Sequence, residues 1–158
     1  MLTIKVVVVG SLKESYFREA VAEYQKRLGA GCKCQVIEVA EQRLPNNPSP
    51  AQIEAGLKKE GEAILAHAAG CCTVALCIGG RRMSSEGLAD FLEKTALATS
   101  QVAFVIGSSH GLSAEVVAKA DTTLSVSDMT LPHQLCRVVL MEQLYRAFSI
   151  NTGGKYHK

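Results

Sequence analysis

The chain has 158 residues, of which 47% are apolar and 20% charged, and its net charge at pH 7 is +2. These values fit one folded domain over residues 1–158 and exclude a chain that is largely disordered. No apolar run approaches the roughly 18 residues of a membrane span, and residues 1–5 lack the basic head of a signal peptide, so we expect a cytoplasmic protein with no membrane partner.

Two strands and a helix are predicted at the start of the chain. Residues 4–9 form a run dominated by β-branched side chains, which is typical of a buried strand, and residues 34–39 are a second strand candidate. Between them, apolar residues recur at helical spacing from Phe17 to Leu28, and Gly29 ends that helix.

A loop and a long helix follow. The three prolines and two asparagines of residues 44–50 predict a loop. Ser49, Pro50 and Gln52 then make a helix start, because serine can cap, proline fits the first helical position and glutamine completes a capping box. We expect this helix to end at Gly70.

The second half of the chain predicts three more strands and three more helices. Residues 88–92 mark a helix, Ser113 opens a short one, and Thr130 and Pro132 open a long helix that runs to about Ile150. The three strands are predicted at residues 73–78, 102–106 and 122–126.

Strands that alternate with helices predict an α/β fold with a mainly parallel sheet flanked by helices. Ligands of such sheets bind in the loops beyond the carboxyl ends of the strands. Candidate sites therefore lie in three loops, at residues 79–84, 107–111 and 127–130.

The loop at residues 107–111 has a glycine at each end and is followed by a helix start. Glycines let backbone approach a ligand closely, and free N–H groups at a helix start can donate to it. The spacing matches neither a dinucleotide-binding nor a phosphate-binding loop. A simple turn with positive φ at glycine explains the loop at least as well, and His110 in it fits a solvated surface residue better than an acid or base.

The C-terminal helix has apolar residues on two faces, so we expect it to be buried on both sides, by the sheet and by a second copy of the chain in a homodimer. Glu142 and Arg146 are four positions apart and fit an ordinary helix ion pair. Arg137 has no evident local partner and suits a carboxylate or phosphate.

The last eight residues combine a glycine pair with Tyr156, His157, Lys155 and Lys158. Aromatic rings that stack on bases and cations that meet phosphates are the elements of single-strand RNA recognition. A frayed terminus is the other interpretation of this composition.

Six cysteines show no Cys-x-x-Cys spacing, so we interpret them as reduced and mostly buried thiols, without a metal. The net charge is too small for RNA to be held by charge alone. If the chain binds RNA, a local cluster and shape recognition must supply the contacts.

Taken together, these segments resemble the RlmH family of the SPOUT methyltransferases. The resemblance runs from Ile4 to the last residue, and its most specific parts are the run from Met129 to Gln134 and the Tyr156-His157-Lys158 end. Ser108 departs from the family pattern, which often has glycine there, and His110 stands where an acidic or amide residue is common. The matching stretches are residues 104–107, 111–113, 124–125, 129–134, 137–139, 142–147 and 156–158.

The resemblance implies a trefoil knot near the C-terminus, a homodimer, and S-adenosylmethionine as cofactor. It implies methylation of N3 of a pseudouridine in 23S ribosomal RNA, on the assembled ribosome. By position, the cofactor-binding residues would be Leu76, Gly107, Val126, Ser127, Asp128, Met129, Thr130 and Leu131.

The reaction requires the imide N–H of the base to lose its proton, and His157 is the candidate catalytic base. Arg137 and Lys158 are candidate substrate-binding cations for the developing oxygen charge, and Tyr156 is the candidate for stacking on the base. The tail of one subunit is expected beside the cofactor of the other.

Two rival functions remain open from the sequence. A non-catalytic RNA-binding or ribosome-assembly protein would keep the tail but would not need the loop at Gly107. A flavodoxin-like or other nucleotide-binding domain would share the strand-loop-helix pattern but gives no reason for residues 129–134 or for the tail.

Overall fold

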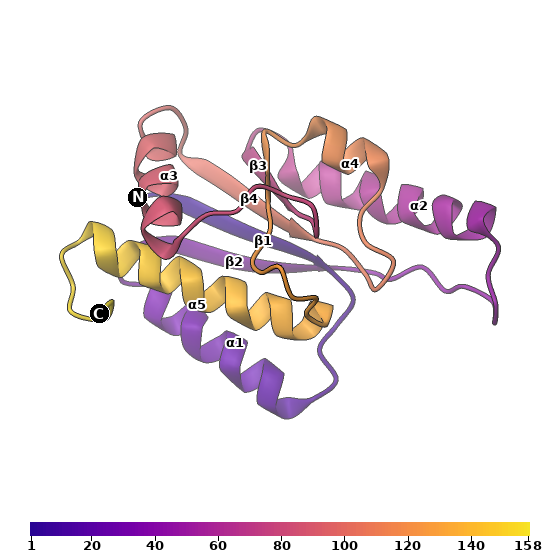
Figure 1. Ribbon diagram of the computed structural model, residues 1–158, viewed down its shortest axis with the longest axis horizontal. Coiled ribbons are helices and arrows are strands. Elements are labelled where there is room, and N and C mark those ends of the chain that lie inside the picture. The colour runs from indigo at the N-terminus through magenta and orange to yellow at the C-terminus, as the bar shows by residue number, and fades with distance from the viewer.

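Five strands form a single sheet in the order β2-β1-β4-β3-β5 in the computed structural model, which describes residues 1–158 (Figure 1). All pairings are parallel, which confirms the predicted α/β fold. The central strand β4 lies between β1 and β3, so it joins the two halves of the sheet. The strands are β1 (Thr3–Val9), β2 (Lys33–Val39), β3 (Cys72–Leu76), β4 (Gln101–Ile106) and β5 (Thr122–Leu124).

Helices cover both faces of the sheet (Figure 1). One face carries α1 (Ser15–Leu28), α3 (Ser85–Ala96) and α5 (His133–Asn151), with α5 packed between the other two. The opposite face carries α2 (Pro50–Ala68) and α4 (Ala114–Lys119). The right-handed crossovers that parallel strands require place helices on both sides.

Side chains of the central strands alternate between two apolar layers. Val6, Val8 and Phe104 pack in the layer of α1, α3 and α5, whereas Val7 and Val105 pack in the layer of α2 and α4. All five are fully buried. Burial on both faces explains why these strands are continuous apolar runs rather than alternating ones.

The capping box is present as predicted, since the Gln52 N–H donates to Ser49 Oγ over 3.2 Å and the Ser49 N–H donates to Gln52 Oε1 over 2.8 Å. The start of α5 differs from the prediction. The helix begins at His133, with Pro132 at the N-cap and no side-chain cap. Thr130 lies in the preceding loop, so it does not start the helix.

Strands β3 and β5 are each two residues shorter at their carboxyl ends than predicted. The Cys77 N–H donates to the Leu124 carbonyl over 3.0 Å, and the Gly80 N–H donates to the Cys77 carbonyl over 3.1 Å. The first bond is the last one between β3 and β5, and the second turns the chain out of the sheet, so the apolar residues beyond the strand ends line a loop instead.

All six cysteines are free thiols, but only Cys32 is fully buried, so the prediction of mostly buried thiols is correct only in part. No group of three or more potential metal-ligating side chains is present. None of the helices combines the length and hydropathy that crossing a bilayer demands.

Candidate functional site

A pocket of about 730 Å³ lies at the carboxyl ends of β3, β4 and β5. We call it the loop pocket. Three separate segments build most of it, and α5 contributes Cys136 from its first turns. This is the position at which open parallel sheets bind ligands. The three segments are residues 76–78, 106–112 and 124–133, without Asp128.

The loop after β4 requires glycine at both of its ends. A Cβ on Gly107 would collide with the carbonyl of Gly111, and Gly111 itself has a φ of +85°. Its N–H donates to the Ser108 carbonyl over 2.9 Å, which closes a tight turn. The predicted positive φ at glycine is therefore confirmed at Gly111, and the absence of a side chain at Gly107 lets the Gly111 carbonyl pack against it.

The loops after β3 and β5 lie directly on one another. A Cβ on Gly80 would stand 2.8 Å from the Leu124 carbonyl carbon, so only glycine fits there. The Ser125 N–H donates to the Arg81 carbonyl over 2.9 Å. These contacts fix the position of both loops at the edge of the pocket.

Serine side chains hold the loop after β5 in its shape. Ser125 Oγ donates to the Ser127 carbonyl over 3.0 Å, and Ser127 Oγ accepts from the Met129 N–H over 2.9 Å. Because these backbone groups are already paired, the loop keeps its form without a ligand, and the Met129 side chain stays 79% exposed.

The structure brings together seven of the eight residues that the sequence assigned to the cofactor. They line the loop pocket and are Leu76, Gly107, Val126, Ser127, Met129, Thr130 and Leu131. Asp128 does not line it. Its carboxylate lies 2.9 Å from Arg82 Nε in an exposed ion pair between two loops, so its contact with the cofactor stays a prediction.

Other residues of the pocket were missed by sequence reasoning. Ile78 and Cys136 line it, but nothing in their local pattern distinguishes them from ordinary apolar residues. Burial raises the pKa of the Cys136 thiol, which makes it a poor nucleophile at neutral pH. Only the packing of α5 against the loops brings it to the site.

The tail folds back onto α5 rather than fraying. The Tyr156 hydroxyl donates to Glu142 Oε1 over 3.1 Å, and the Arg146 guanidinium lies 4.7 Å from the centre of the Tyr156 ring. Tyr156 also meets the ring of Tyr145 edge to face at 4.7 Å. Glu142 and Arg146, whose side chains pair at 2.7 Å, therefore both contact the tail and hold it against α5.

His157 bridges two helices. Its Nδ1 lies 3.1 Å from Arg146 Nη1, and its Nε2 lies 2.7 Å from Glu86 Oε1 at the start of α3. A guanidinium only donates, so Nδ1 must accept and Nε2 carries the hydrogen that Glu86 accepts. The pKa of Glu86 is lowered by its own backbone N–H and by His157. Lys158 is exposed beside this pair.

The tail and the loop pocket of one chain lie apart. His133 lines the pocket and Arg146, which holds the tail, follows it by 13 positions on the same helix. An α-helix rises about 1.5 Å per residue, so roughly 20 Å separates them. Figure 1 shows the C-terminus near the end of α5 that is opposite to its first residue.

Arg137 does not face an open site. Its side chain is 3% exposed, its Nη1 lies 3.0 Å from Glu38 Oε2, and its Nη2 donates to the Gly10 carbonyl over 3.1 Å. The sequence offered no local partner because Glu38 is 99 residues away. The expected grip of Arg137 on a substrate is therefore corrected to a structural role, in which it ties α5 to the ends of β1 and β2.

Comparison with known proteins shows which family the chain resembles. The family model described as "Predicted SPOUT methyltransferase" matches residues 2–157. The chain is 48% identical to ribosomal RNA large subunit methyltransferase H of Lactococcus lactis subsp. lactis strain IL1403, over 99% of this chain and 100% of that protein. It is 49% identical to the protein of the same description from Ligilactobacillus salivarius strain UCC118, with the same coverage.

Solved structures of low sequence identity share the fold. A probable methylase family protein from Haemophilus influenzae Rd KW20 superposes with a TM-score of 0.59 at 18% identity, covering 98% of this chain and 70% of that one. A probable methyltransferase from Bordetella pertussis Tohama I gives a TM-score of 0.58 at 14% identity, covering 92% and 95%.

Proposed function

The chain belongs to the SPOUT methyltransferase family, and on that premise we propose that it is an S-adenosylmethionine-dependent methyltransferase of large-subunit ribosomal RNA. The observation that carries this proposal is the 47–49% identity, over essentially the whole of both chains, to relatives described as ribosomal RNA large subunit methyltransferase H. As substrate we propose N3 of a pseudouridine in 23S ribosomal RNA on the assembled ribosome, which places the reaction in the cytoplasm.

The loop pocket fits the methyl donor. Its volume of about 730 Å³ lies within the range of small-molecule sites, about 300–1,000 Å³. Apolar side chains such as Leu76 and Leu131 suit an adenine ring, and the backbone at Gly107 and residues 126–131 suits its polar edge. The bound donor would supply an electrophilic methyl group, so the protein contributes mainly position and proton removal.

We propose that the active enzyme is a homodimer in which the tail of one subunit reaches the loop pocket of the other. The roughly 20 Å along α5 that separates tail and pocket within one chain supports this arrangement. The face of α5 opposite its buried stripe remains partly exposed, at Leu135 and Val139 among others, which supports pairing of α5 with a second copy.

Within that composite site, His157 is the proposed base for the imide proton, Tyr156 the proposed stacking residue and Lys158 the cation nearest the oxygen charge. In the docked tail the lone pair of His157 Nδ1 faces Arg146, so this contact must open before the imidazole can accept a proton. Glu142 and Arg146 are positioning residues, because both hold the tail in place.

We also propose that the segment after β5 is threaded as a trefoil knot. The contact of Gly80 with Leu124 and the bridge between Arg82 and Ser125 support it, because they lay the loop after β3 across the chain that leads into α5.

The test is methyl transfer to ribosomes. Ribosomes from a strain that lacks this gene are incubated with the protein and S-adenosylmethionine carrying a labelled methyl group, and the labelled nucleotide is mapped by nuclease digestion and mass spectrometry. We expect one methyl group per large subunit, on a pseudouridine of 23S RNA. Binding of the ribosome without methyl transfer, and no calorimetric binding of the donor, would support the rival non-catalytic function instead.

A further inference from the structure

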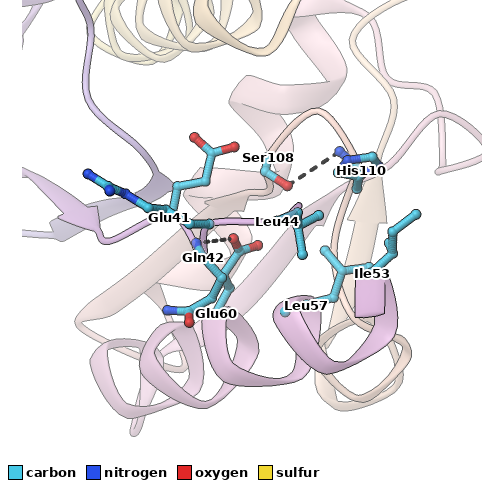
Figure 2. Close-up of a pocket in the computed structure, with 10 residues that line it drawn as sticks. Glu41, Gln42, Leu44, Ile53, Leu57, Glu60, Ser108 and His110 are labelled. Carbon is cyan, nitrogen blue, oxygen red and sulfur yellow. Dashed lines mark hydrogen bonds between the residues drawn. The ribbon is translucent and has the colours of Figure 1, made fainter. Parts of the chain in front are cut away.

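A second cavity, of about 360 Å³, lies on the other side of the loop at residues 107–111. We call it the Glu60 cavity. The loop forms one wall through Ser108 and His110, which also line the loop pocket. The other walls are α2 and the segment at residues 41–44, between β2 and α2 (Figure 2). The two cavities are therefore neighbours that share one wall.

A buried carboxylate forms the floor of this cavity. Glu60 is 4% exposed, and its Oε2 accepts from the Gln42 N–H over 2.9 Å. Its Oε1 makes no hydrogen bond of regular geometry, although the Ser108 hydroxyl lies near enough to lower the pKa of the carboxyl. Burial raises the pKa of Glu60, while the Gln42 N–H and the Ser108 hydroxyl act against the rise. A buried acceptor without a donor costs free energy, and native proteins leave few of them.

One side wall of the cavity is apolar. Leu44, Ile53 and Leu57 stand on one side of the carboxylate (Figure 2). Gly56 makes this arrangement possible, because a Cβ there would come within 3.3 Å of Leu44 Cδ2 and push the wall outward. Glu41 and Arg43 also line the cavity. The result is a slot with one apolar wall, polar and charged side chains elsewhere, and a hydrogen-bond acceptor at its base.

We propose that the Glu60 cavity receives one base of the substrate RNA, whose amino group donates a hydrogen bond to Glu60 Oε1. A nucleobase has the matching chemistry, with flat apolar faces and, in adenine, cytosine and guanine, an amino group at its edge. This inference rests on the proposed RNA substrate and deepens it, since it adds a second base to the one that is methylated.

The methyl donor does not require this cavity. The loop pocket has about twice its volume and already holds seven of the residues assigned to the donor. A position beside the loop pocket is the one that a neighbouring nucleotide would occupy when the target base approaches the donor. Uracil is a poor occupant, because its imide N–H is flanked by two carbonyl oxygens that the carboxylate would repel.

The test is a titration that does not depend on methyl transfer. Isotope-labelled full-length protein is saturated with S-adenosylhomocysteine and titrated with adenosine, cytidine or uridine 5′-monophosphate, while backbone amide resonances are followed by NMR. We expect the first two to shift the amides of Leu44, Gly56 and Leu57, which line only the Glu60 cavity, with at least fivefold weaker binding of uridine monophosphate. Equal binding of all three, or shifts confined to the loop pocket, would overturn the inference even in the wild-type protein.

Glu60→Gln sharpens the test. The amide oxygen can keep the Gln42 N–H, which leaves the amide NH₂ facing the cavity, so an acceptor becomes a donor. We expect the base preference to invert toward uridine, and the KM for ribosomes to rise at least fivefold with little change in kcat. Glu62→Gln, at an exposed position of the same helix, is the matched control and should match wild type.

The remaining outcomes are also decisive. An unchanged base preference in Glu60→Gln would assign the carboxylate a purely structural role. Weakened binding of S-adenosylmethionine by that variant would make the cavity part of the donor site and refute the inference. These outcomes are distinguishable from a failure of the proposed function, because in that case the wild-type protein itself would methylate no ribosomes.

Discussion

The guanidinium of Arg137 and the carboxylate of Glu38 lie 3.0 Å apart across 99 residues of chain, and they tie the start of α5 to the end of β2. The two partners differ in environment, since the side chain of Arg137 is 3% exposed and that of Glu38 is 47% exposed. Glu38 can therefore be solvated alone, whereas Arg137 cannot. Because of this difference in exposure, we expect the two partners to differ in how much stability is lost when each is removed.

Removing the acid should cost more stability than removing the base. Glu38→Ala leaves a buried cation with only the Gly10 carbonyl, so we expect a loss of about 3 kcal/mol in the free energy of unfolding. Arg137→Met leaves a carboxylate in contact with water and should cost less, about 1 kcal/mol or below. Urea denaturation of the two variants measures both. A larger loss for Arg137→Met would contradict the argument.

Gly107→Ala should abolish donor binding. The added Cβ would collide with the Gly111 carbonyl, so the loop must move out of the position in which its backbone faces the loop pocket. We expect the affinity for S-adenosylmethionine, measured by calorimetry, to fall at least tenfold. Gly79→Ala is the control, because nothing lies within 4 Å of a Cβ there, and it should bind the donor normally.

The proposed transfer of the tail between subunits can be tested by mixing two inactive proteins. One lacks residues 153–158 and keeps its loop pocket, and the other carries Gly107→Ala and keeps its tail. Random exchange makes half of the dimers mixed, each with one complete site, so about a quarter of wild-type activity should return. If mass spectrometry confirms mixed dimers and activity stays absent, the tail does not act on the partner's pocket.

Cys34 should resist alkylation in the folded protein. Burial raises the pKa of this thiol from its ordinary value of 9.0 to about 11. The thiolate is the reactive form, so at pH 8 its population, and hence its rate with iodoacetamide, should be about a hundredfold lower than that of an unfolded cysteine. Labelling should accelerate as the pH approaches 11. Peptide mass spectrometry, with urea-unfolded protein as the reference, measures the rate.

Local patterns in the sequence were sufficient for the order of the elements and for the loops that line the loop pocket. The capping box at Ser49 and the positive φ at Gly111 are local requirements, and both are present. The ends of β3 and β5 were predicted too late, because Gly80 turns back onto Cys77 and Ser125 pairs with Arg81 of the loop after β3. A hydrogen bond between distant segments leaves no local pattern.

The side chains of the site were harder to assign for the same reason. Asp128 pairs with Arg82 and Arg137 pairs with Glu38, and both partners lie far away in the sequence. Glu86 and Arg146 were missed as contacts of His157 because they lie on two different helices. Nothing in the sequence predicted the Glu60 cavity, since a glutamate on an amphipathic helix is usually solvated.

The central place of β4 has a consequence for the chain as it leaves the ribosome. Until residues 101–106 are synthesised, β1 and β2 form a pair with one unsatisfied edge, and β3 has no strand to join. Strand edges of this kind, with unpaired backbone N–H and C=O groups, invite association with other nascent chains. We therefore expect the risk of association to fall once residues 101–106 are synthesised and β4 pairs with both β1 and β3.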